Sequence, residues 1–144
     1  MQVNMRHDYI YEQPRSSELL SLPIALKHKE ETNATDQFTC MCMHHLKDPE
    51  NGRHYMKATT LRGTIPLNKT SVWCDGKHKH QLINGRLKSG QLRTAFAQTY
   101  TTTYNKRLAR DVKVFLEQGS AYPMDEAATE DPYQVGEPLS LIHI

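Results

Sequence analysis

Cysteine and histidine residues gather in two short groups of this 144-residue chain, a pattern typical of metal ligands. The first group reads Cys-Met-Cys-Met-His-His at residues 40–45, and the second reads Cys-Asp-Gly-Lys-His-Lys-His at residues 74–80. Structural zinc takes four nitrogen or sulfur ligands, commonly as two pairs from two turns or strand ends. The chain has three cysteines, and an odd number without an apolar leader segment disfavours a disulfide framework. We therefore expect one metal site that joins the two groups.

The expected ligands are three cysteines and one histidine, with two further histidines as substitutes. Alternate positions of a strand face the same side, so the two cysteines of the first group can point together, and so can the two histidines of the second. Gly76 lets the chain turn between Cys74 and His78. The set is Cys40, Cys42, Cys74 and His78, with His44 or His80 as substitutes. The competing interpretation is that these are buried strand cysteines and surface histidines.

The second group also resembles a known family. Cys74-Asp75-Gly76-Lys77-His78 is similar to the core of the CDGSH iron–sulfur proteins, with a lysine where that family has a small residue. The family also has an upstream Cys-x-Cys, which Cys40 and Cys42 would match, although 31 residues separate Cys42 from Cys74 here. The resemblance implies a [2Fe-2S] cluster held by three cysteines and one histidine. We keep this cluster as the alternative to zinc.

Charge is distributed unevenly along the chain. Residues 53–113 contain thirteen Lys or Arg and two Asp, a balance of +11, although the whole chain carries only +2. Residues 114–144 contain six acids and no Lys or Arg. A basic block attracts polyanions, and salt weakens that attraction steeply. The predicted nucleic-acid-binding residues are Lys77, Lys79, Arg86, Lys88, Arg93, Lys106, Arg107 and Arg110. The alternative is a solvated surface that the acidic segment partly neutralises.

Hydrophobic periodicity predicts an α+β fold with a small antiparallel β-hairpin sheet followed by one long amphipathic helix. Residues 36–61 alternate around a turn at 48–52, which predicts the hairpin, and residues 70–74 and 81–83 suggest further short strands, three to four in all. Apolar residues then recur every three or four positions from Leu92 to Phe115. Ser89 would cap this helix, and the threonine run at 101–103 would kink or split it.

Composition and local pattern also divide the chain into segments. We expect an N-terminal arm and linker at residues 1–35, a basic α+β domain at 36–118 and an acidic, disordered tail at 119–138, with both termini flexible. Residues 139–144 (LSLIHI) resemble one reading frame of a sequencing adaptor and are interpreted as an artefact. No stretch approaches the roughly 20 apolar residues of a membrane span, so a cytoplasmic location without membrane partners is expected.

The patterns favour a binding protein over an enzyme, because no nucleophile elbow, phosphate loop or zinc-protease motif is present. The leading hypothesis is a small nucleic-acid-binding module, stabilised by zinc, that contacts the phosphate backbone of DNA or RNA through its basic loop and helix. A self-assembling packaging protein of a virus or mobile element, and hence a homo-oligomer, is the second hypothesis. The iron–sulfur protein is the third.

Overall fold

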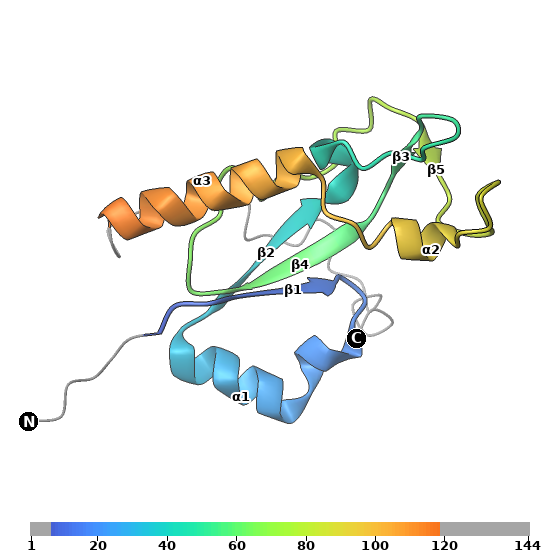
Figure 1. Ribbon diagram of the computed structural model, residues 1–144. Helices are drawn as coiled ribbons and strands as arrows, with labels where there is room; N and C mark the ends of the chain where they lie inside the picture. The colour runs from blue at the N-terminus through green and yellow to red at the C-terminus, as the bar shows by residue number, and fades with distance from the viewer. Residues whose placement is uncertain (1–6, 119–144) are drawn as a thin grey trace, which may run out of the picture.

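The fold is a three-stranded antiparallel sheet with helical elements on both faces. The computed structural model describes residues 7–118 (Figure 1). The main sheet has the order β1-β4-β2, in which β1 is Ile10–Pro14, β4 is Ala58–Gly63 and β2 is Thr35–Cys40. Helix α3 (Thr102–Gln118) lies on one face, and the short helix η1 (Glu18–Ser21) with α1 (Pro23–Thr32) lies on the other (Figure 1). The predicted α+β class, with an antiparallel sheet and a long helix at its C-terminal end, is confirmed.

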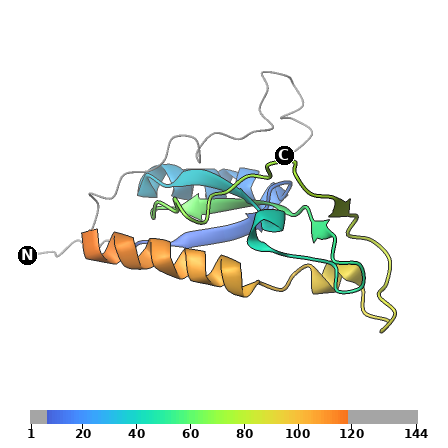
Figure 2. The ribbon, with the colours of Figure 1, turned by 90° about the horizontal axis from the view of Figure 1, so that it is seen from above.

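Smaller elements extend from one end of this body. They are η2 (Met41–His44), β3 (His54–Tyr55), β5 (His80–Gln81) and α2 (Arg93–Phe96). Strands β3 and β5 pair in parallel, with His54 opposite His80. The views in Figures 1 and 2 place β3, β5 and α2 together, beyond the N-terminal end of α3.

The central pairing is that of the predicted hairpin. β2 and β4 pair antiparallel, with Phe38 opposite Thr60. The third strand of the sheet is β1, which pairs with β4 and places Glu12 opposite Leu61. Residues 70–74 form no strand, contrary to expectation, and the expected strand at 81–83 is the two-residue β5 instead.

Three elements, β1, η1 and α1, lie where the sequence predicted an arm and linker. β1 carries no strong local period and gains its order from the ladder with β4, which is about 50 residues away in the chain. α1 begins with Pro23 in its first turn, where a missing N–H costs nothing. The expected tail at 119–138 and residues 139–144 lie outside the described residues.

The predicted long helix is divided in two. α2 ends at Phe96, and α3 begins at Thr102, within the threonine run. The Thr101 hydroxyl accepts a hydrogen bond from the Tyr104 amide (3.1 Å), as an N-cap residue does, and donates one to the His44 carbonyl (2.6 Å). Ser89 therefore caps no helix, and the split that the threonines suggested is confirmed.

Two buried clusters join these layers. One surrounds Tyr55 and Tyr104, and the other surrounds Leu61 and Phe115, while Leu108 packs against both. Because Tyr104, Leu108 and Phe115 lie on one side of α3, this helix links the sheet to the region of η2 and β3. Within residues 7–118, no helix is long and apolar enough to cross a membrane.

Candidate metal centre and basic surface

Four side chains from the two cysteine and histidine groups meet in space. Their ligand atoms all lie within 4.8 Å of one another, and the four residues are Cys42, Cys74, His78 and His80. The Cys74 sulfur is 3.6 Å from Nε2 of His78 and 3.6 Å from Nε2 of His80. Cys42 is buried, and the other three are half-buried. The cluster could hold a metal ion.

Three short elements position the four ligands. Cys42 lies in η2, which follows directly from the central strand β2. His80 lies in β5, which the pairing with β3 holds beside His54. Cys74 and His78 flank a loop in which Gly76 has a φ of 72°, a conformation that glycine adopts at little cost. The turn that the sequence suggested at Gly76 therefore exists, and it brings Cys74 and His78 together.

The loop also provides contacts to the ligands themselves. The Gly76 amide donates to the Cys74 sulfur (3.4 Å). Asp75 Oδ1 accepts from the Lys77 amide (2.9 Å) and lies 3.6 Å from Nδ1 of His78. Metal-ligating histidines commonly offer their second nitrogen to a carboxylate in this way. Asp75 therefore lies on the Nδ1 side of the His78 ring, whose Nε2 faces Cys74.

Cys40 and His44, two of the sequence-predicted ligands, are not among the four. The Cys40 sulfur lies 3.1 Å from that of Cys42, behind it, and is fully buried. The strand β2 ends at Cys40, and the turn of η2 changes the alternation that was expected to continue to Cys42. His80, expected as a substitute, completes the set.

His44 has a structural role instead. Its Nδ1 accepts a hydrogen bond from Arg107 (3.0 Å), and its Nε2 contacts the Thr39 hydroxyl (2.7 Å) and the Thr70 carbonyl (3.0 Å). Because Nδ1 accepts, Nε2 carries the proton and donates it to Thr70. Burial, together with the positive charge of Arg107, lowers the pKa of His44 to about 4. The ring is therefore neutral near pH 7.

A further histidine, His54, borders the centre and was not predicted. Its ring centroid lies 4.3 Å from that of His78, and burial next to other cationic groups lowers its pKa. Its sequence neighbourhood contains no cysteine or second histidine pair, so only the β3–β5 pairing reveals its position. His54 packs against the ring of His78.

The predicted nucleic-acid-binding residues fall into two kinds. Six have exposed side chains, namely Lys77, Lys79, Arg86, Lys88, Lys106 and Arg110. Arg93 instead binds Asp48 (2.7 Å) and Glu50 (3.2 Å), and Arg107 donates to the Met43 carbonyl (2.8 Å) as well as to His44. These two guanidinium groups stabilise the fold, so the remaining six are the candidates for an external ligand.

A buried carboxylate holds the basic loop in place. Asp48 is fully buried and accepts hydrogen bonds from the Tyr55 hydroxyl (2.6 Å) and Arg93 Nε (2.7 Å), besides two backbone amides of its own turn. Burial raises the pKa of Asp48, but these hydrogen bonds outweigh it and lower the pKa to about 2. The carboxylate therefore ties residues 84–93 to the turn at 48–52.

Comparison with protein-family models, with curated proteins and with solved structures gives no match to this chain. The functional assignment consequently rests on the geometry of the site and on the charge around it.

Proposed function

We propose that the protein is a zinc-stabilised nucleic-acid-binding module, in which the loop at residues 74–80 presents lysines to a phosphate backbone. The observation that carries the proposal is the alternation at residues 77–80. His78 and His80 belong to the cluster, while Lys77 and Lys79, which alternate with them in the sequence, are exposed. A metal bound to the histidines would hold both lysines on the outer surface of one short loop.

The ligand geometry supports a single zinc ion. For Zn–S near 2.3 Å and Zn–N near 2.05 Å, the S···N edge of a tetrahedron is about 3.6 Å. Both distances from the Cys74 sulfur to the histidine nitrogens are 3.6 Å. Thiolate and imidazole ligands disfavour magnesium and calcium, which prefer oxygen. Four protein ligands leave no open position, which is typical of a structural rather than a catalytic site.

Elemental analysis of the purified full chain tests the metal assignment. We expect one zinc per chain, loss of zinc in Cys42→Ala, and retention in the matched variant Cys40→Ala, whose thiol is the neighbour outside the cluster. Two irons per chain with a visible absorption band would favour the CDGSH-like cluster instead. Absence of any metal would contradict the assignment.

Phosphate binding is tested by titrating fluorescent duplex DNA and single-stranded RNA with the full chain at several salt concentrations. For duplex DNA, each lost phosphate contact reduces the slope of log affinity against log salt by about 0.9. We therefore expect Lys77→Ala/Lys79→Ala to reduce that slope by about 1.8 while zinc content is unchanged. The matched control is Lys27→Ala on α1, an exposed lysine paired with Glu31 on the other face of the sheet.

Two results would contradict nucleic-acid binding. One is the absence of detectable binding to either nucleic acid at low salt, and the other is a double variant with the affinity and slope of the unmodified chain. Because zinc content is measured on the same samples, a failure of phosphate binding remains separable from a failure of the metal site.

A further inference from the structure

Within residues 7–118, the outer edge of strand β1 pairs with no other strand. Among the described residues β1 pairs only with β4. The Arg15 amide donates to the Ala58 carbonyl (3.0 Å), and the Thr64 amide donates to the Tyr9 carbonyl (3.0 Å). Odd-numbered residues therefore direct their backbone groups toward β4, and the alternation of an antiparallel ladder directs those of Ile10 and Glu12 outward. Such an edge is a template for another strand.

Helix α3 overhangs this edge with an apolar surface. Seen from above in Figure 2, α3 runs along β1 on the side away from β4. A groove on the helix is lined by Leu108, Ala109, Val112 and Leu116, and Leu116 is 74% exposed. Helices pack on sheets through apolar side chains, so this surface has the position and character of a cover for one more strand.

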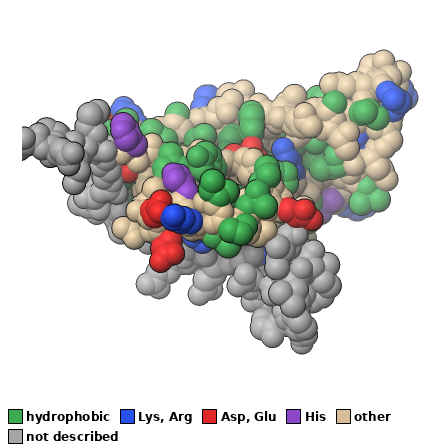
Figure 3. Space-filling view, turned by 90° about the horizontal axis from the view of Figure 1, so that it is seen from below, with side chains coloured by type: hydrophobic (Ala, Val, Ile, Leu, Met, Phe, Trp, Pro, Cys, Tyr) green, Lys and Arg blue, Asp and Glu red, His purple; other side chains and the backbone are tan. Residues whose placement is uncertain are grey.

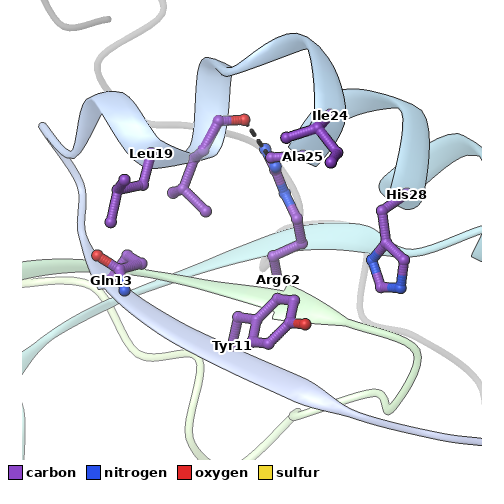
Figure 4. A pocket seen from close by; sticks show the side chains of 8 residues that line it. Tyr11, Gln13, Leu19, Ile24, Ala25, His28 and Arg62 are labelled. Atoms are coloured by element: carbon purple, nitrogen blue, oxygen red, sulfur yellow. Dashed lines mark hydrogen bonds between the residues drawn. The ribbon is translucent and has the colours of Figure 1, made fainter.

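The opposite face of the same edge is also apolar. Tyr11 and Gln13 of β1 line a pocket together with Leu19, Ile24 and His28 from η1 and α1 (Figure 4). Ile24 is 78% and Leu19 57% exposed. Figure 3 shows hydrophobic side chains gathered over this face of the molecule. A strand added beside β1 would place alternate side chains in this pocket and under α3.

A carboxylate oxygen of Glu12 favours a positively charged ligand at this edge. Glu12 points to the α3 side, into a pocket that Tyr100, Tyr104 and Leu108 also line. Its Oε2 accepts a hydrogen bond from the Tyr100 hydroxyl (2.7 Å), whereas its Oε1 is buried and has no hydrogen-bond partner within residues 7–118. An unpartnered buried carboxylate oxygen is costly, and a cation relieves that cost. The stacked rings of Tyr100 and Tyr104, 5.5 Å apart, also attract a cation.

From these observations we propose that the open edge of β1, beneath α3, binds an extended peptide strand of a partner protein. That strand carries a lysine or arginine with apolar residues on both sides. The basic side chain pairs with Glu12, its apolar neighbours enter the Tyr11 and Ile24 pocket, and the next apolar residues pack under Leu108 and Leu116. Backbone pairing supplies affinity, and the two pockets supply specificity. A second copy of β1 fits less well, because it would bring another Glu12 to the same face.

The test is an NMR titration of the full chain with the peptide acetyl-SVLKLVS-amide, compared with acetyl-SVLELVS-amide. We expect the lysine peptide to shift the Ile10 and Glu12 amides and to slow their hydrogen exchange, and the glutamate peptide to do neither. Glu12→Gln, which keeps an acceptor for Tyr100, should weaken binding by about tenfold. Glu18→Gln, in the exposed first turn of η1, is the matched control and should bind as before. Leu116→Lys tests the overhang and should abolish binding.

Three results would overturn the proposal. The first is no amide shift at millimolar lysine peptide, or equal binding of both peptides. The second is a dimer in light scattering that Leu116→Lys dissociates, which would assign the edge to a second copy. The third is protection of the Ile10 and Glu12 amides in the free full chain that disappears on truncation after Gln118, which would assign the edge to the chain's own later residues.

Discussion

The main sheet and residues 64–92, which contain three of the four candidate metal ligands, are stabilised by different interactions. β2 and β4 form a six-residue ladder whose side chains are largely buried, with Leu61 at the centre. Residues 64–92 contain only the two-residue strand β5, and side chains tie them to the rest, namely those of Gln37, Thr39, Glu50 and Asp111 and the candidate metal centre. A segment with so few backbone contacts depends on each anchor individually. The sheet should therefore tolerate changes that release the loop.

Metal removal gives the largest expected effect. Structural zinc contributes about 10–16 kcal/mol of apparent binding free energy in small zinc domains. Chelation of the full chain should remove hydrogen-exchange protection from residues 73–92 and leave that of β2 and β4 in place. Cys74→Ser should reproduce this state, and Cys40→Ala should not. Loss of protection throughout the sheet would show that the two regions form one cooperative unit.

Asp48→Asn should weaken the attachment of residues 84–93 to the turn at 48–52. Removing one partner of a buried ion pair costs about 3–5 kcal/mol, because the Arg93 guanidinium loses its buried carboxylate. We expect the amides of residues 84–93 to exchange faster, with zinc still bound, and urea unfolding monitored at Trp73 to measure the cost. Glu50→Gln is the control, since it removes the charge from the more exposed contact of Arg93 and keeps an acceptor oxygen for the Lys88 amide. Equal effects of the two variants would contradict the role assigned to Asp48.

Leu61→Ala tests the sheet by the same measurement. Truncation of a fully buried leucine costs about 2–5 kcal/mol through lost burial and the cavity that remains. Hydrogen exchange should accelerate across β1, β2 and β4, and the zinc content should not change. Leu82→Ala, at a position that is 73% exposed, should have an effect near zero. Loss of zinc from Leu61→Ala would show that the sheet positions the ligands more directly than we expect.

Acidification should destabilise the folded protein through protonation of His44. Its pKa is lowered from 6.5 to about 4 in the folded state, so the unfolded chain binds the proton more readily. This stability is complete above pH 6.5 and decreases as the pH falls toward 4, by at most about 3 kcal/mol. Thermal unfolding between pH 7 and pH 4 measures this loss of stability. The metal-free protein is used because release of metal at low pH would also destabilise the fold. His44→Gln should flatten the profile, and an unchanged profile would contradict this origin.

Local pattern predicted the parts of the fold that local sequence controls. The β2–β4 pairing, the turn at 48–52 and the division of the helix at its threonines each follow from residues close in the chain. β1 was missed because five residues without a clear period become a strand only against β4. The strand expected at 70–74 fails because the Thr70 amide and hydroxyl are taken by Asp111 of α3, 2.8 Å away in each case. Nothing near residue 70 in the sequence indicates that partner.

The candidate site shows the same division. Residue type and spacing alone determined that the chain carries two groups of metal-binding side chains, one of them beside alternating lysines. Only the tertiary structure decided which of these side chains cluster, because Cys40 lies outside the group of four and the β3–β5 pairing brings His80 into it. It also decided which cations remain available, since Arg93 and Arg107 are bound by groups distant in the chain. The chemistry available is a property of composition, whereas the coordination geometry and the free charge depend on long-range packing.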